Sequence, residues 1–276
     1  MPRKLIDFDD IFAAYLNRWY AENKDKYADY GALEEAAGGV YGDWADMPLA
    51  ECGGVSARRY FETSAPEELV RMLIGYAASD MSPPDLLIER LAAAPECHRW
   101  LLEIARRRES AELTALAVNI LTGDGADGCG VTELLCDWIF DENCNGEPLD
   151  LAVEKLIERI GEAAPALLRR MTENMTGRTE RALADILVYA PRDERIYALL
   201  LHLFNGGGDR ALYASYLGKY GDARALPALV EFGKRRDINY LEFIEARNAA
   251  ETLGGALENK KDWTQDEYYR ALKGLD

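Results

Sequence analysis

The sequence predicts an all-α protein, an α-α superhelix (solenoid) of about six helix pairs preceded by an N-terminal helical and loop cap. From about Ser64 onward, amphipathic stretches of roughly 10 to 16 residues alternate with short breaks at Gly, Pro or Asp. No stretch shows the convincing period-2 alternation of a β-strand. Successive helices pair into units that recur about every 30 residues, and such a period is typical of helical repeats.

Composition narrows the class of protein. The chain has 276 residues, is 49% hydrophobic and carries a net charge of −17, so it can bury a substantial core but repels phosphate backbones. We therefore expect no nucleic-acid partner. Because no stretch supplies the roughly 18 apolar residues of a membrane span and the start lacks a signal-peptide core, we expect no membrane association and a cytoplasmic location. Five cysteines are an odd number and indicate reduced thiols.

Residues 1–63 are predicted to form the cap. A first helix is expected over about Phe8–Asn23, because its apolar residues recur with helical spacing. The segment Gly38–Phe61 combines several glycines with Trp44 and Tyr60, which indicates an ordered aromatic loop too broken for a helix. We expect these aromatic side chains to cover the otherwise exposed end of the first repeat.

Residues 64–255 are predicted to hold the repeats. In the first of them, Ser64 and Glu67 have the spacing of a capping box, and Leu69, Leu73 and Tyr76 form one apolar stripe. The repeats are expected to begin near Pro66, Pro95, Val131, Pro165, Arg192 and Asp222. Residues 256–276 are predicted to close the array with a helix near Asp266–Leu272.

The last two repeats are the most alike. Asp193-Glu194-Arg195 aligns with Asp222-Ala223-Arg224, and Leu217-Gly218 is expected to occupy the same buried position as Leu253-Gly254. The run from Tyr216 to Leu229, with Pro227 at the usual first-helix kink, resembles bacterial HEAT-like repeats of the type also found in phycobilisome-lyase relatives. The resemblance covers residues 178–255 best, extends more weakly back to 64, and implies a surface that binds an extended partner.

Negative charge is concentrated in one stretch. Residues 124–162 contain eleven acidic side chains and two basic ones, which indicates either a solubilising surface or a docking face for a basic protein or peptide. The candidate partner-binding residues are Asp137, Asp141, Glu142, Glu147, Asp150, Glu154 and Glu158, together with Tyr213 and Tyr216 on a later helix.

Asp141, Asn143 and Asn145 also resemble the opening of a calcium loop, with Gly146 at the sixth position. Ala152 stands where such a loop needs its bidentate glutamate, so a turn rich in Asn and Gly is the preferred interpretation and no metal is assigned. Cys129, Cys136 and Cys144 lack the paired short spacing of a zinc site.

No catalytic residue and no cofactor is predicted. The chain has two histidines, and adjacent residues such as Cys97 and His98 point about 100° apart on a helix, so they do not form a nucleophile pair. Gly206-Gly207-Gly208 follows no strand and is expected to be a turn between helices. The predicted function is non-enzymatic protein binding. The alternatives are a HEAT-like enzyme of the chromophore-lyase or DNA-glycosylase type, and an acidic immunity-type inhibitor of a basic toxin.

Overall fold

The computed structural model describes residues 3–123, 126, 129–172 and 174–275. Among these residues the regular structure is helical, and β-structure is limited to one isolated bridge between Pro48 and Ser56, so the predicted all-α class is confirmed for this part of the chain. Contacts divide the chain into two compact units, residues 1–134 and 135–276. None of the described helices is long and apolar enough to cross a membrane.

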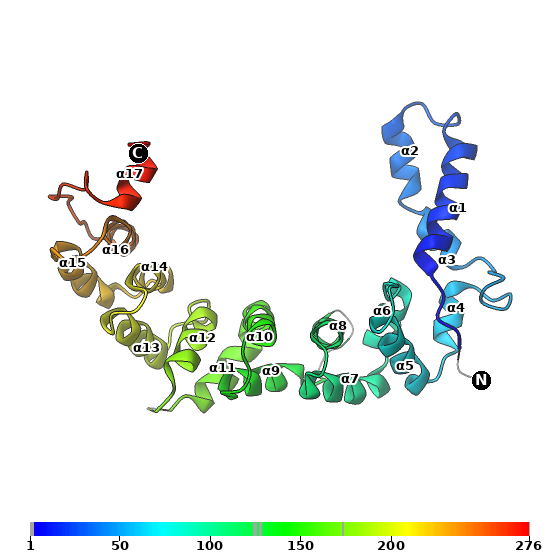
Figure 1. Cartoon of the computed structure of the whole chain (residues 1–276), viewed down its shortest axis with the longest axis horizontal. Coiled ribbons are helices and arrows are strands. Elements are labelled where there is room, and N and C mark those ends of the chain that lie inside the picture. Colours follow the sequence, from blue (N-terminus) through cyan, green and yellow to red (C-terminus); the bar gives the residue numbers. More distant parts are fainter. Residues whose placement is uncertain (1–2, 124–125, 127–128, 173, 276) are drawn as a thin grey trace. The chain divides into compact units, whose positions relative to one another are not determined.

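Figure 1 labels the helices along the chain. The first unit contains α1 (Phe8–Asn23), α2 (Tyr30–Ala37), α3 (Val40–Ala45), α4 (Ala57–Glu62), α5 (Pro66–Ala77), α6 (Asp85–Ala92), α7 (Pro95–Arg107) and α8 (Ala111–Thr122), and the boundary between the units falls within α9 (Val131–Phe140). The second unit continues with α10 (Glu147–Glu158), α11 (Ile160–Arg170), α12 (Gly177–Leu187), α13 (Glu194–Asn205), α14 (Arg210–Tyr220), the 3-10 turn η1 (Ala223–Ala225), α15 (Leu226–Lys234), α16 (Tyr240–Thr252) and α17 (Glu267–Lys273).

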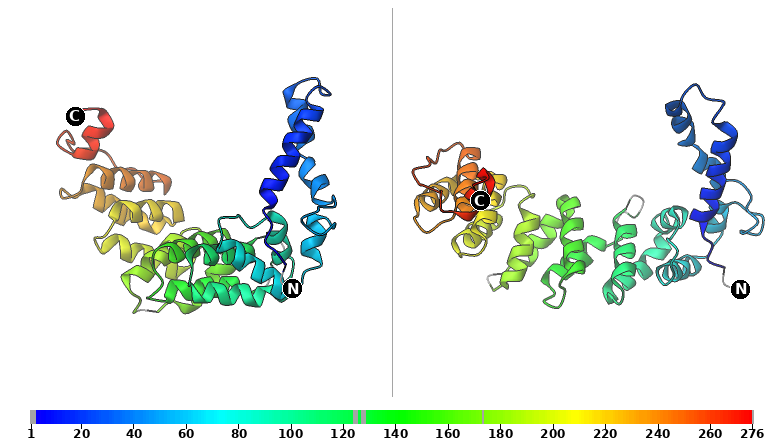
Figure 2. Two further views of the ribbon diagram at one scale, coloured as in Figure 1. Left: turned by 45° about the vertical axis from the view of Figure 1, so that its right-hand side comes forward. Right: turned by 45° about the horizontal axis from the view of Figure 1, so that its top comes forward.

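Among the described helices from α5 to α16, five of the six expected pairs pack closely, whereas α9 and α10 make no comparable contact. In the first unit α5 packs on α6 and α7 on α8, and in the second unit the pairs α11/α12, α13/α14 and α15/α16 pack in the same way. The second helices of neighbouring pairs are also in contact: α6 packs on α8, α10 on α12 and α14 on α16. Figure 2 shows α13/α14 and α15/α16 as successive layers of the second unit.

The aromatic segment before the repeats is partly helical, so the prediction of a loop too broken for a helix is wrong. α3 and α4 have six residues each, a length that is unstable alone and must be held by packing. Trp44 and Phe61 are 1% exposed, and the Phe8 ring lies 5.3 Å from that of Phe61. The expected packing of the aromatic side chains is thus confirmed. α1 runs alongside α2 and α3 in both figures.

This N-terminal segment covers the first repeat through hydrogen bonds as well as rings. The Tyr76 hydroxyl on α5 donates to the Ile6 carbonyl at 2.8 Å and accepts from the Ile6 amide at 3.2 Å, and α4 packs on α6. Burial raises the pKa of Tyr76 to about 12. The predicted stripe of Leu69, Leu73 and Tyr76 is fully buried.

Two local predictions at helix starts are wrong. Ser64 does not cap α5; its hydroxyl donates to the Tyr60 carbonyl at 2.8 Å, and Ala65 is the residue at the cap. The fourth repeat begins at Ile160 and not near Pro165, which lies inside α11. A single residue, Arg159, separates α10 from α11, so no turn residues mark this boundary in the sequence.

The paired Asp-x-Arg sequences make the same hydrogen bonds at the starts of α13 and of η1. The Asp193 carboxylate accepts from the Arg195 amide at 2.9 Å, and Asp222 accepts from the Arg224 amide at 3.0 Å. Each aspartate also binds the guanidinium of its own arginine, which lowers the pKa of both carboxyls. Helix starts of this kind are therefore a repeated element of the second unit.

The expected equivalence of Leu217-Gly218 and Leu253-Gly254 is wrong. Leu217 and Gly218 are buried within α14, whereas Leu253 follows the last residue of α16 and Gly254 is exposed with a φ of 83°. The residue that corresponds to Gly254 is Gly221, which ends α14 with a φ of 78°. Both glycines adopt the left-handed conformation that ends helices.

The remaining turns and the C-terminal helix follow the predictions. Gly206–Gly208 lie between α13 and α14, as expected of an inter-helix turn. Pro227 is the second residue of α15, directly after the break from η1. α17 starts one residue after Asp266, whose side chain accepts from the Tyr269 amide at 3.0 Å. Thus residues 1–63, 64–255 and 256–276 contain α1–α4, α5–α16 and α17, respectively.

Candidate functional site

The predicted acidic residues fall into two groups in the second unit. Asp124 and Asp127, at the start of the acidic stretch, lie outside the described residues. Asp137 pairs with Arg170 at 2.7 Å, and Glu142 accepts from the Thr176 hydroxyl at 2.9 Å. Asp137 thus contacts α11, and Glu142 contacts the residue that precedes α12. The second group, Glu147, Asp150, Glu154 and Glu158, lies exposed on α10.

Asp141, Asn143 and Asn145 lie in the turn between α9 and α10. Asp141 Oδ1 accepts from the Asn143 backbone amide at 3.0 Å and from its side-chain amide at 3.3 Å, and the Asn145 side chain donates to the Glu142 carbonyl at 3.2 Å. These are the bonds of a closed polar turn, which supports the preferred interpretation. No cluster of three or more His, Cys, Asp or Glu side chains suited to a metal occurs within the described ranges.

α10 presents two parallel stripes of side chains. Leu149, Val153 and Ile157 recur every four residues and are half-buried, while Asp150 and Glu154 stand directly beside them and are exposed. Residues spaced by four lie above one another on one helix face. Together the two stripes line a groove of ≈ 570 Å³ between α10 and α12.

α12 supplies the opposite wall of this groove with Arg178, Arg181 and Asp185. Arg178 has a structural role, because its guanidinium donates hydrogen bonds to the backbone carbonyl of Ile139, at 2.6 Å, and to that of Cys144. It thereby ties α12 to the end of α9 and to the turn before α10. Asp185 is the acidic side chain that α12 contributes to the groove, and Asp150 and Glu154 line the same groove from α10.

The two predicted tyrosines have different roles. Tyr213 is 3% exposed and belongs to the packed interior. Tyr216 is half-buried, and its hydroxyl donates to Asp185 Oδ1 at 2.8 Å, which links α14 to the groove. Burial and the Asp185 carboxylate raise the pKa of Tyr216. Asp150 and Glu154 thus line the groove, whereas Tyr216 is connected to it only through Asp185 and Tyr213 does not line it.

Asp185 was missed in the sequence, although the stripes on α10 could have been found from their spacing of four. Nothing in the local pattern of α12 distinguishes Asp185 from other acidic residues, because its partner lies 31 residues away. Burial raises the pKa of this carboxyl, while the Tyr216 hydroxyl and the charge of Arg181 act in the opposite direction. Desolvation therefore makes the ionised form of Asp185 less stable than it would be in water.

We expect the substitution Asp185→Asn to raise the melting temperature at pH 7. A carboxyl with a raised pKa in the folded state contributes most to stability below its unfolded pKa, and this contribution falls as the pH rises through the folded pKa. The advantage of the variant should therefore shrink at pH 3. Thermal unfolding followed by circular dichroism at pH 3, 5 and 7 measures the difference.

Tyr216→Phe is the control for this prediction, because it removes the hydroxyl that stabilises the ionised carboxylate. It should lower the melting temperature more at pH 7 than at pH 3. Equal differences between Asp185→Asn and the parent chain at all three pH values would contradict the assigned burial cost.

The histidines and cysteines form no reactive pair in the described structure. Cys97 is buried with its pKa raised to about 11 by desolvation, and its thiol points to the Pro66 carbonyl. His98 Nε2 lies 2.7 Å from the Ala92 carbonyl oxygen. His202 is exposed and lies 3.8 Å from Glu180. No disulfide joins any of the five cysteines in the described structure.

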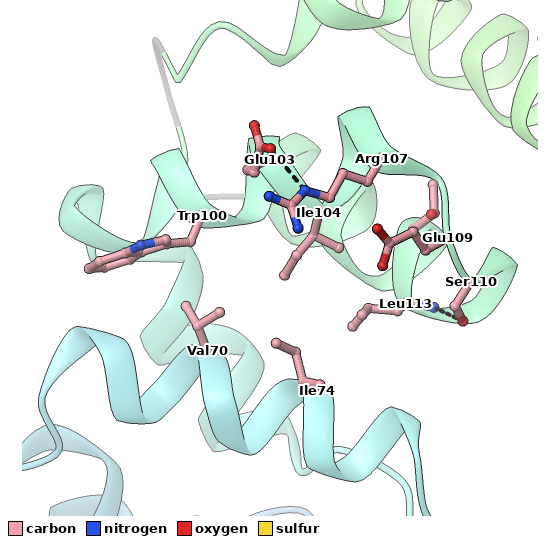
Figure 3. Close-up of a pocket in the computed structure, with 10 residues that line it drawn as sticks. Val70, Ile74, Trp100, Glu103, Ile104, Arg107, Glu109, Ser110 and Leu113 are labelled. Atoms are coloured by element: carbon pink, nitrogen blue, oxygen red, sulfur yellow. Dashed lines mark hydrogen bonds and ion pairs between the residues drawn. The ribbon is translucent and has the colours of Figure 1, made fainter.

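The first unit contains a separate pocket, shown in Figure 3. It has a volume of ≈ 330 Å³ and lies between α5, α7 and α8. Val70 and Ile74 face it from α5, Trp100 and Ile104 from α7, and Leu113 from α8. Its lining is completed by Glu103, Arg107, Glu109, Ser110 and Thr114. The walls are thus mainly apolar with a charged side.

Comparison of the chain with protein-family models, with curated proteins and with solved structures gives no match. The functional assignment therefore rests on the groove of the second unit and the pocket of the first.

Proposed function

We propose that this chain is a non-enzymatic protein-binding protein of the HEAT-like helical-repeat type, and that the groove between α10 and α12 binds a basic, extended segment of another protein. The observation that carries the proposal is the pair of stripes on α10, apolar Leu149, Val153 and Ile157 beside acidic Asp150 and Glu154. The contacts between second helices of neighbouring pairs support the solenoid arrangement, and solenoids bind extended partners on such helices.

The chemistry of the groove fits lysine and arginine side chains. Their aliphatic stems cover apolar surface while the charged ends stay near water and carboxylates. The half-buried stripe would receive the stems, and Asp150 and Glu154 on α10 would receive the charges. Arg181 faces the same groove, so the partner must place its positive charges nearer α10 than α12.

The excess of acidic residues in the chain supports a protein partner over a nucleic acid. The same excess of negative charge argues against the DNA-glycosylase alternative, because such an enzyme needs a basic groove to bind DNA.

The test is reversal of charge on α10. The triple variant Glu147→Lys, Asp150→Lys and Glu154→Lys should bind a twelve-residue peptide of alternating arginine and leucine at least about tenfold more weakly than the parent chain at 50 mM salt. Binding is measured by fluorescence anisotropy of the labelled peptide. At 500 mM salt the difference should decrease, because screening weakens exposed charge pairs.

A control variant separates the groove from overall charge. Glu22→Lys, Glu34→Lys and Glu35→Lys produce the same change in net charge on exposed residues of α1 and α2, and they should leave peptide affinity within about twofold. Equal losses in the two triple variants would reject the groove as the binding site. Helicity measured by circular dichroism must be unchanged in both.

A further inference from the structure

The pocket between α5, α7 and α8 contains a buried hydroxyl group that the fold leaves without a partner. Thr114 on α8 lines this pocket and is 2% exposed. Its Oγ1 atom has no hydrogen-bond partner among the residues that the structure describes. Most buried side-chain polar groups in proteins are hydrogen-bonded, and one that is not costs free energy. An unpartnered hydroxyl beside a cavity therefore favours a ligand that supplies the missing hydrogen bond.

Another threonine of the same helix shows how such a hydroxyl is usually satisfied. The Thr122 hydroxyl donates to the carbonyl of Val118, four residues before it, at 2.9 Å. Thr114 makes no corresponding bond to the carbonyl of Ser110. Rotation about its Cα–Cβ bond exchanges the positions of the hydroxyl and the methyl group. The Thr114 hydroxyl can therefore turn toward a ligand in the pocket.

The other walls of the pocket suit the apolar part of such a ligand. Figure 3 shows Val70 and Ile74 on α5 opposite Trp100, Ile104 and Leu113. Ile74 is 43% exposed, so a large apolar surface is open on the α5 side. The volume of ≈ 330 Å³ lies near the lower end of the range of small-molecule sites, about 300 to 1,000 Å³. It suits one ring or one branched chain.

The charged side chains of the lining do not favour a charged ligand. Arg107 Nε already donates to Glu103 at 2.9 Å, and both side chains are exposed, so water screens this pair. Glu109 is exposed and directly precedes Ser110, the N-cap of α8, where the positive end of the helix dipole offsets a negative charge. The buried polar group, Thr114, is neutral. A charged ligand group beside it would lose its hydration without gaining an opposite charge.

We propose that this pocket binds a small neutral molecule, an apolar ring or branched chain that carries one hydroxyl or carbonyl group, with the apolar part between Val70, Ile74 and Trp100 and the polar group on the Thr114 hydroxyl. This site is separate from the groove between α10 and α12 and does not depend on the proposed protein-binding function.

The test compares three probes of similar size and different charge, benzyl alcohol, benzylamine and benzoate, titrated into the full chain. Binding is followed by the NMR signal of the Trp100 indole N–H, assigned with Trp100→Phe. We expect benzyl alcohol to shift this signal along a saturation curve. Benzylamine and benzoate should both bind at least about tenfold more weakly, because their charges would have to leave water.

Substitutions of threonine locate the hydrogen bond. Thr114→Val keeps the shape of the side chain and should weaken benzyl alcohol at least about fivefold, whereas Thr114→Ser keeps the hydroxyl and should stay within about threefold of the parent chain. Thr122→Val is the matched control on α8, because Thr122 does not line the pocket, and its affinity should stay within about twofold.

Thermal unfolding of the free variants shows whether the effect of Thr114→Val comes from the ligand or from the fold. This substitution removes an unpartnered buried hydroxyl, so the melting temperature without ligand should be unchanged or higher. A loss of affinity without a loss of stability would support the proposed contact.

Any of three results would overturn the proposal. The first is no saturable shift of the Trp100 signal by benzyl alcohol up to about 20 mM, the range expected for a ligand of so few atoms. The second is binding of benzylamine or benzoate as tight as that of benzyl alcohol. The third is the same affinity in Thr114→Val and Thr122→Val.

Discussion

Gly218→Ala should destabilise the second unit by about 1–3 kcal/mol, because an added Cβ overpacks a close helix contact. That atom would lie 2.8 Å from both Cα and Cβ of Ala249 on α16. A backbone atom cannot rotate away as a side chain does, so α14 and α16 would have to separate. The change should appear as a lower midpoint of urea unfolding and as faster hydrogen exchange in α14 and α16.

Gly161→Ala is the matched control. Gly161 lies in α11, and an added Cβ would meet no atom within 4 Å among the described residues. The same substitution should there stabilise the chain by up to about 1 kcal/mol, because alanine is the better helix former. Equal effects of the two substitutions would show that the contact between α14 and α16 is looser than described.

Trp44→Ala should cost about 3–5 kcal/mol, as expected for the loss of a large buried aromatic side chain. Trp44 is 1% exposed, and its ring lies 5.0 Å from that of Phe12 and 5.6 Å from that of Tyr41. The short helix α3 depends on this packing. We expect residues 8–62 to become sensitive to limited proteolysis and to lose hydrogen-exchange protection.

Tyr30→Ala provides the comparison in the same segment. Tyr30 is 68% exposed, so its removal should change stability by no more than about 0.5 kcal/mol. If Trp44→Ala were no more sensitive to protease than Tyr30→Ala, the aromatic cluster would not be what holds α1–α4 in place.

Much of the candidate groove could be predicted from the sequence. Asp150 and Glu154 were selected because acidic residues crowd this part of the chain, and Leu149, Val153 and Ile157 follow a spacing visible in the sequence. Asp185 could not be predicted, because its contact with Tyr216 joins α12 to α14, which are distant in the sequence. The pocket of the first unit was missed for the same reason, since its walls come from three helices.

The sequence by itself determined the all-α class and the starts of several helices, among them α1, α5, α7 and α9. Helical periodicity, the Asp-x-Arg starts of two repeats and the left-handed glycines at helix ends are properties of a few consecutive residues. Such local signals do not depend on contacts with distant parts of the chain.

Tertiary structure alone decided which side chains are buried and where separate helices meet. The six-residue helices α3 and α4 exist because Trp44 and Phe61 pack against Phe8, and Gly218, not Gly254, marks the close approach because Ala249 lies against it. Likewise, the Glu142 carboxylate accepts a hydrogen bond from the Thr176 hydroxyl, whereas Asp150 is exposed. These outcomes depend on contacts between residues distant in the sequence, and the local pattern of hydrophobic and polar residues does not encode them.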